Sequence, residues 1–221
     1  MNPGATTSPQ SYLIVANGNS LPSNLAAEVS KAGGTLTSTI PQVGIAVASS
    51  SNASFESKAA KLGTVLPNLT IQWIEPVDVV TGPEVFGNPP ASGDDDFFFD
   101  LQWGHDAVDA PEAWTAGEFG AGARVAIVDS GLDWDHPDLA TQVNTALSTS
   151  FVPGETVNPP PGFFFDHGTH VGGTVGAADN AFGVIGVASQ AELVGVQVLS
   201  RATGSGSFDQ VIAGIVYATD I

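Results

Sequence analysis

The apolar residues in the first third of the chain alternate between strand-like and helix-like spacing. Ser11–Ala16 (SYLIVA) is typical of a strand, and Leu21–Lys31 carries apolar residues at the spacing of a helix. The pattern then predicts two strands joined around Pro41, a second helix and a closing strand, over residues 35–40, 43–48, 51–62 and 71–74. The order βαββαβ predicts a small α+β domain of ferredoxin-like topology.

The later part of the chain has a different pattern, in which continuous apolar runs alternate with helical segments. Arg124–Val128 and Glu192–Leu199 are typical of strands buried in a parallel sheet. Residues 169–179 predict a helix so rich in Gly and Thr that it must pack closely against its neighbours. This alternation predicts an α/β domain with a doubly wound parallel sheet.

A last helix is predicted near the C-terminus. Ser207 and Gln210 form a capping box, and the helix that follows is expected to end near Thr219. The next strand of the sheet would begin at residues 220–221, so we expect the sheet to be partial in this chain.

The two patterns are separated by a segment rich in Pro and Gly that also holds the acidic run Asp94–Asp96. Such a composition is typical of an exposed linker. Phe97–Phe99 are unusual there and are expected to dock onto a folded surface. We therefore predict a disordered N-terminus, a small α+β domain, a linker and an α/β domain, over residues 1–10, 11–76, 77–100 and 101–221.

Charge separates the same two parts. The formal net charge of the chain is −18, and all of the excess lies after residue 76, where twenty acidic residues face two arginines. The electrostatic field of this negative charge repels phosphate groups, which argues against nucleic acid as a partner. It suits cation binding, a salty milieu or simply a well-hydrated surface.

Composition also narrows the class of protein. No apolar run of about 18 residues is present, so no membrane-spanning helix is predicted. The chain has no cysteine, which excludes disulfides and thiolate metal sites. Its first ten residues lack the basic and apolar regions of a signal peptide.

Two residues are candidates for chemistry. Asp129 follows a buried strand in Val-Asp-Ser-Gly, at the end of a parallel strand, where ligands and catalytic groups gather. His167 lies in Asp-His-Gly-Thr-His, directly before the Gly-rich helix. Taken singly, Asp129 could equally be a helix cap or structural carboxylate, and His167 a buried, hydrogen-bonded histidine.

Considered together, the two motifs resemble a known family. VAIVDSGLDWDHPDL at 125–139 and HGTHVGGTVGA at 167–177 resemble the Asp and His boxes of subtilisin-like serine peptidases. GVIGVA at 183–188 and VQVL at 196–199 continue the resemblance at matching spacing. The first domain resembles, more weakly, the family's inhibitory propeptide, in the segments SYLIVA, AGG, VGIAVAS and IQWIEP.

The resemblance implies a secreted endopeptidase with a Ser-His-Asp triad, polypeptide substrates and its own propeptide as a partner. Asp129 would orient His167, and His167 would act as the general base toward a serine. The second histidine, His170, is expected to be structural. The family's Ser box does not occur within the 221 residues, so we expect this chain alone to be inactive.

The resemblance also implies two binding regions. Gly204-Ser205-Gly206 would pair with an extended peptide through the backbone, although Gly and Ser are equally typical of a flexible loop. A structural Ca²⁺ would be held by three side chains and three backbone carbonyls, those of Asp95, Asp138 and Asn180 and of Ala178, Phe182 and Val184. The acidic run around Asp95 is also compatible with a solvated surface.

Other classes stay open at this point. The Asp-Ser-Gly at Asp129 fits half of an aspartic-protease site, but no second such motif occurs. His167, His170 and Asp129 could bind zinc, although the spacing lacks the general-base Glu of His-Glu-x-x-His. A non-enzymatic alternative is a propeptide-like binding module on an inert scaffold.

Overall fold

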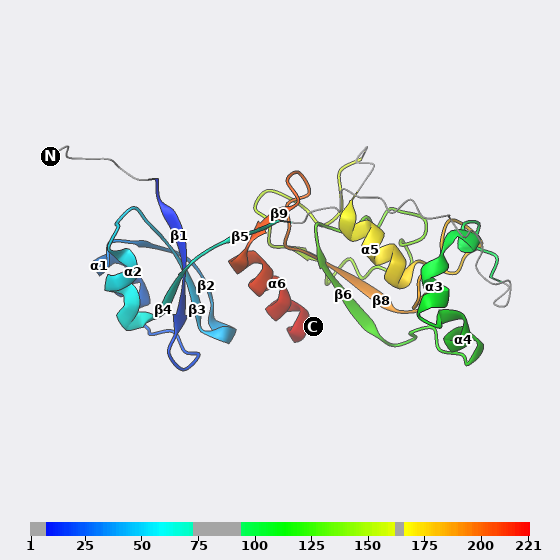
Figure 1. Ribbon diagram of the computed structural model, residues 1–221, viewed down its shortest axis with the longest axis horizontal. Coiled ribbons are helices and arrows are strands. Elements are labelled where there is room, and N and C mark those ends of the chain that lie inside the picture. Colours follow the sequence, from blue (N-terminus) through cyan, green and yellow to red (C-terminus); the bar gives the residue numbers. More distant parts are fainter. Residues whose placement is uncertain (1–7, 73–93, 162–165) are drawn as a thin grey trace. The chain divides into compact units, whose positions relative to one another are not determined.

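The computed structural model describes residues 8–72, 94–161 and 166–221 (Figure 1). Most of the predicted N-terminal tail and linker, residues 1–7 and 73–93, lies outside this description. The chain forms two compact units. The first comprises the N-terminal residues through Ile71 together with Ser207–Asp220, and the second comprises Gln72–Gly206.

The first unit is built on a four-stranded antiparallel sheet of order β2-β3-β1-β4. The strands are β1 (Gln10–Ala16), β2 (Thr35–Ile40), β3 (Ile45–Ser50) and β4 (Gly63–Pro67). Two helices, α1 (Leu25–Lys31) and α2 (Phe55–Ala59), lie on one side of it in Figure 1. Pro41–Val43 forms a 3-10 turn between β2 and β3, and the turn ends at Gly44 with a left-handed φ of 65°.

Both faces of this sheet are apolar, because successive side chains of a strand point to opposite faces. Ile14 and Ala46 belong to the core that contains Phe55 and the buried residues of α1 and α2. Leu13 and Val47 belong to the opposite core. That second core includes helix α6 (Phe208–Asp220), through its apolar residues Phe208, Ile212, Ala213 and Val216.

The fourth strand of this sheet was predicted at the wrong place. The structure forms β4 from Gly63–Pro67, whereas Ile71 and Gln72 belong to the short strand β5 (Thr70–Gln72), which is not part of this sheet. Only Gly63 and Val65 of β4 are buried, so its apolar pattern is too short to stand out. Residues 73–74 of the predicted strand lie outside the described ones.

The second unit contains a parallel sheet of order β6-β8-β7. Its strands are β6 (Arg124–Asp129), β7 (Thr149–Ser150) and β8 (Glu192–Gln197). The register pairs Arg124 with Glu192 at one end of β6 and Asp129 with Gln197 at the other. The predicted parallel α/β sheet is thus confirmed. Another short strand, β9 (Ser205–Ser207), precedes α6.

Helix α5 (His167–Gly176) packs on this sheet through a stripe of glycines. A Cβ on Gly172 would lie 2.5 Å from Leu132 Cδ1, and one on Gly176 would lie 3.0 Å from Leu193 Cδ2. The glycines therefore allow the helix to approach the core of Ile127, Leu132 and Leu193 closely.

Two short helices, α3 (Trp103–Ala107) and α4 (Ala110–Thr115), precede the sheet in the chain. Phe99 is buried there against Trp114 and Ile185, whereas Phe97 and Phe98 are exposed at 77% and 47%. Only one of the three phenylalanines docks as predicted. Among the described residues, no helix is long and apolar enough to cross a membrane.

Candidate active site

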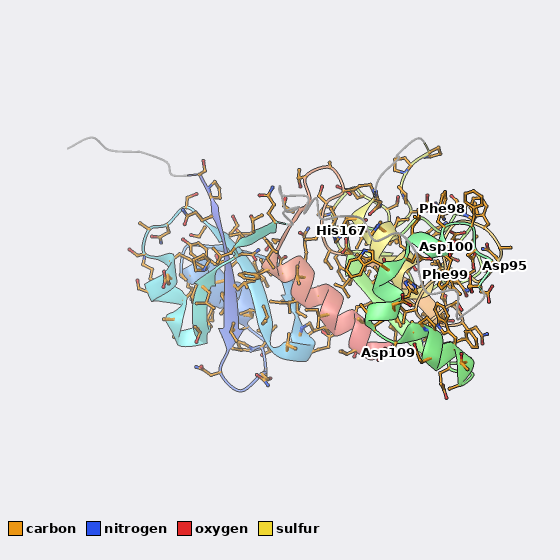
Figure 2. The ribbon with its side chains drawn as sticks, turned by 45° about the vertical axis from the view of Figure 1, so that its right-hand side comes forward. Asp95, Phe98, Phe99, Asp100, Asp109 and His167 are labelled. Carbon is orange, nitrogen blue, oxygen red and sulfur yellow. The ribbon has the colours of Figure 1, made fainter. Side chains whose placement is uncertain are left out.

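Asp129 and His167 meet at the edge of the parallel sheet. Asp129 is the last residue of β6 and His167 the first of α5, where Figure 2 shows its side chain. The Nδ1 atom of His167 lies 2.9 Å from both carboxylate oxygens of Asp129. An ionised carboxylate only accepts hydrogen bonds, so Nδ1–H is the donor. The side chain of Asp129 is 13% exposed and that of His167 is 31% exposed.

The backbone holds this pair in place. The carbonyl of Asp129 accepts from the amides of Val198 and Leu199, at 2.8 and 3.2 Å, so the end of β6 is fixed to the chain after β8. The amide of Ser130 donates to Asp129 Oδ1 at 2.6 Å. A Cβ on Gly168 would lie 2.1 Å from the carbonyl oxygen of Gly131, so glycine there allows the two segments to touch.

Asp166 caps the helix that begins with His167. Its side chain accepts from the amide of Gly168 at 3.1 Å, which satisfies a donor of the first helical turn. Asp166 Oδ1 also accepts from the hydroxyl of Ser130, the residue after Asp129. This role of Asp166 was not predicted from the sequence, although an Asp directly before a helical pattern is an N-cap signal.

A cavity of about 320 Å³ opens beside the pair. Asp129, Ser130 and His167 line one part of it, and the segment 199–204 contributes most of the rest. Of the three residues predicted to bind substrate, Gly204 lines the cavity, and Ser205 and Gly206 follow in β9. Gln72, the last described residue of the N-terminal segment, also lines it.

The loop 178–184 is held by two buried carboxylates. Asp138 Oδ2 accepts from the amide of Val184 at 3.2 Å, and its backbone carbonyl accepts from the amide of Ala178 at 2.8 Å. Asp96 Oδ1 accepts from the amide of Phe182 at 3.0 Å. Each carboxylate retains one buried oxygen without a hydrogen-bond partner, Asp138 Oδ1 and Asp96 Oδ2. Such an arrangement is costly unless the oxygens gain a proton or a cation.

Of the acidic run Asp94–Asp96, the buried Asp96 contacts this loop, whereas Asp95 is exposed (Figure 2). Burial and the neighbouring Asp94 raise the pKa of Asp96 to about 6. Oxygens of Asp94, Asp96 and Asp179 lie within 4.8 Å of one another. Burial, followed by Asp94 and Asp95, also raises the pKa of Asp179. The exposed Asn180 accepts from the amide of Phe182 at 2.9 Å.

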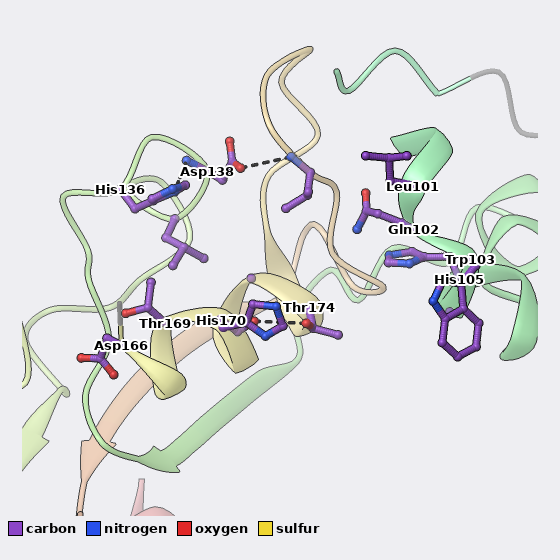
Figure 3. A pocket seen from close by; sticks show the side chains of 14 residues that line it. Leu101, Gln102, Trp103, His105, His136, Asp138, Asp166, Thr169, His170 and Thr174 are labelled. Atoms are coloured by element: carbon purple, nitrogen blue, oxygen red, sulfur yellow. Dashed lines mark hydrogen bonds between the residues drawn. The ribbon is translucent and has the colours of Figure 1, made fainter. Parts of the chain in front are cut away.

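A larger cavity of about 630 Å³ lies elsewhere on α5 (Figure 3). His136 and Asp138 line one side, Gln102 and His105 the other, and His170 projects from the helix between them. His170 thus lines this second cavity and not the cavity beside the Asp129–His167 pair. Among the described residues, His167, His170 and Asp129 are not grouped closely enough to hold one metal ion, which removes the zinc alternative.

Part of the chain is similar to known proteins. Residues 120–221 match the model of the subtilase family. Subtilisin E of Bacillus subtilis (strain 168) is 43% identical over 118 residues, which cover 53% of this chain and 29% of that protein. Subtilisin Savinase of Lederbergia lenta is 45% identical over the same length, covering 53% of this chain and 40% of that protein. The chain thus spans less than half the length of these relatives.

A solved structure extends the likeness to the whole chain. Fervidolysin from Fervidobacterium pennivorans, a keratinolytic enzyme related to subtilisin, matches with a TM-score of 0.76. The match covers 100% of this chain and 35% of the other, at 24% identity, and so concerns the fold alone. Residues 120–221 therefore match the subtilase family, and together the comparisons support a fragment of a subtilisin-like serine peptidase in this part of the chain.

Proposed function

We propose that the protein is a serine endopeptidase in which Asp129 and His167 are two members of the catalytic triad. The observation that carries the proposal is the contact of His167 Nδ1 with both oxygens of Asp129, 2.9 Å each, beside a cavity. This contact fixes one imidazole tautomer, with the proton on Nδ1 and a lone pair on Nε2. His167 is then a general base.

The reaction follows from that tautomer. Nε2 of His167 takes the proton of a serine hydroxyl as the oxygen attacks the peptide carbonyl. Asp129 stabilises the imidazolium that forms, and His167 returns the proton to the leaving amine. Water then repeats the cycle on the acyl-enzyme, and the proton again passes through Nε2.

The nucleophile of this proposal is a serine downstream of residue 221 in a longer protein, since the family order is Asp, His, Ser. Ser130 is close to the pair but is 6% exposed. Its hydroxyl donates to Asp166 and accepts from the amide of Gly168. The 221-residue chain by itself is expected not to hydrolyse peptides. A serine-inhibitor-sensitive activity of this chain would argue for a different nucleophile.

The N-terminal domain is proposed to be the enzyme's inhibitory propeptide, with ferredoxin-like topology. Two observations support this. One face of its sheet packs on α6, a helix from the other end of the chain. Gln72, the residue directly after the N-terminal part of the first unit, lines the cavity beside His167. Secretion, which the family resemblance implies, belongs to the same proposal.

We expect the isolated segment 1–80 to inhibit the mature enzyme when added in trans. The apolar face around Leu13 and Val47 provides the contact with α6. A variant with Val47→Asp should inhibit far more weakly, because an unpaired carboxylate on that face is costly to bury. Inhibition is measured by titrating peptide hydrolysis. No effect of the unmodified segment at micromolar concentration would contradict the propeptide assignment.

The region 204–206 is proposed to bind the substrate backbone. Gly204 lines the cavity, and Ser205–Ser207 is extended as β9. An extended peptide could add to such a segment through main-chain hydrogen bonds.

A structural Ca²⁺ is proposed at the loop 178–184. The unpartnered oxygens of Asp138 and Asp96 fit a hard cation that prefers oxygen ligands. Asp138, Asn180 and the carbonyls of Ala178, Phe182 and Val184 remain the proposed set. We propose Asp96 as a ligand in place of Asp95, because Asp96 is the buried residue that contacts the loop. The ion would fix the loop to its two neighbouring segments.

Removal of calcium is expected to lower the melting temperature of the protein. A ligand that binds only the folded state stabilises it by about 2.7 kcal/mol at a hundredfold excess over its Kd. Thermal unfolding with calcium and with EDTA measures the difference. Asp96→Asn should abolish the response and Asp95→Asn should retain it. An unchanged transition in EDTA would count against the site.

A further inference from the structure

Arg201 is the most extensively bonded cation in the described part of the second unit. Its side chain is only 6% exposed. Its Nε donates to Asp166 Oδ2 at 2.7 Å, and its Nη2 donates to the carbonyls of Thr156 and Val157 at 3.1 and 2.8 Å. Glu155 lies 3.9 Å from its Nη1. A guanidinium can serve this set because it presents several N–H groups in a fixed planar fork.

Glu155 holds the segment that carries Arg201 by its backbone. It accepts from the amide of Arg201 at 3.0 Å, from the hydroxyl of Ser200, and from Gln197 Nε2 at 2.8 Å. Burial raises the pKa of Glu155, but these hydrogen bonds outweigh it and the net effect is a lowered pKa. The wall of the active-site cavity that includes Arg201 is thus fixed to residue 155.

The other end of the network reaches the Asp129–His167 pair. Asp166, the partner of Arg201, is 2% exposed by its side chain. It caps the helix that His167 begins, and it accepts from Ser130. The guanidinium also lies against the backbone after Asp129, since a Cβ on Gly131 would be 2.2 Å from Arg201 Nη2.

We propose that Arg201 is a positioning residue that fixes the substrate-side segment 200–204 to the Asp129–His167 pair. Arg201 holds Asp166, and Asp166 caps the helix that begins with His167. Asp166 also accepts from the hydroxyl of Ser130, so the position of the residue next to Asp129 depends on Arg201 as well. The segment 200–204 and the pair line the same cavity, so their separation determines where a bound peptide lies relative to His167. This inference rests on the proposed peptidase function.

The test uses Arg201→Met and Arg201→Lys, with Arg124→Met as the matched control. Arg124 is the only other arginine of the sequence. It pairs with Glu192 at the opposite end of the same two strands and is 40% exposed. Hydrogen exchange of β6 and β8 in the 221-residue chain establishes that each variant is folded. If Arg201→Met does not fold, the test rests on Arg201→Lys alone. The lysine keeps a positive charge between the carboxylates of Asp166 and Glu155, so this variant is expected to fold.

The first readout is the NMR resonance of the proton between His167 Nδ1 and Asp129, in the 221-residue chain labelled with ¹⁵N-histidine. His167→Gln assigns the resonance among the four histidines. A charge-assisted hydrogen bond of this kind is sensitive to geometry. We expect the resonance to shift or disappear in both Arg201 variants and to be unchanged in Arg124→Met. An unshifted resonance in a folded Arg201 variant overturns the inference.

The second readout is kcat/KM for peptide hydrolysis by the full-length protein. Misplacement by about 1 Å can cost about 100-fold, so we expect a loss of that order in Arg201→Met and about tenfold in Arg201→Lys. Arg124→Met should stay within about twofold, as for an exposed ion pair. Wild-type activity in a folded Arg201 variant overturns the inference. A full-length wild type without peptidase activity refutes the proposed function instead, and the NMR readout still tests Arg201.

Discussion

Replacement of Asp129 by Asn in the full-length protein is expected to lower kcat for peptide hydrolysis by roughly 10⁴-fold. The amide can present its NH₂ group to Nδ1 of His167, which then holds the proton on Nε2, where a base needs a lone pair. The cavity and the fold should persist, because Asn has nearly the same shape as Asp.

Asp109→Asn is the matched control. Asp109 is exposed between α3 and α4, away from His167 in Figure 2, and its left-handed φ of 57° is one that Asn tolerates. Its activity should equal that of the wild type. Near-normal turnover of Asp129→Asn would remove Asp129 from the triad.

The largest loss of stability is expected from Phe55→Ala in the first unit. Phe55 is fully buried in the core between the sheet and its two helices, and its ring centroid lies 5.0 Å from that of Tyr12 with the ring planes tilted by 47°. Truncation of such a phenylalanine typically costs about 3–5 kcal/mol. The opening free energies of β1 and β3 amides, from hydrogen exchange in the 221-residue chain, measure the loss within this unit.

Leu66→Ala tests whether burial is the cause. Leu66 lies in β4 of the same sheet but is 46% exposed, so its truncation should cost less than about 1 kcal/mol. Equal losses for the two variants would mean that the core around Phe55 is not closely packed.

The sequence predicted those features that depend on contiguous residues. The apolar runs at 124–128 and 192–199 are long enough to mark buried strands, and they form the parallel pair β6–β8. The Gly- and Thr-rich helix was predicted over residues 169–179, and the structure forms it at His167–Gly176 with Gly168, Gly172 and Gly176 buried. Asp129 and His167 were expected to meet because the segments around them resemble the Asp and His boxes of subtilisin-like serine peptidases.

Features that depend on three-dimensional register were not predictable. Asp94, Asp95 and Asp96 are chemically identical in the sequence, and only the burial of the third distinguishes it. The Arg201–Asp166 ion pair joins residues that are 35 positions apart in the sequence, and no local sequence pattern predicts it. Likewise, the apolar face of α6 predicts a buried helix but not that it packs with the N-terminal unit.

The most direct test of the proposed triad is fluorophosphonate labelling of the full-length protein, with and without His167→Ala. The reagent captures a serine only when a base activates its hydroxyl. We predict that one serine downstream of residue 221 is labelled rapidly and that His167→Ala slows labelling by at least about 10³-fold. Labelling at the same rate in both proteins would contradict the assignment of His167 as the catalytic base.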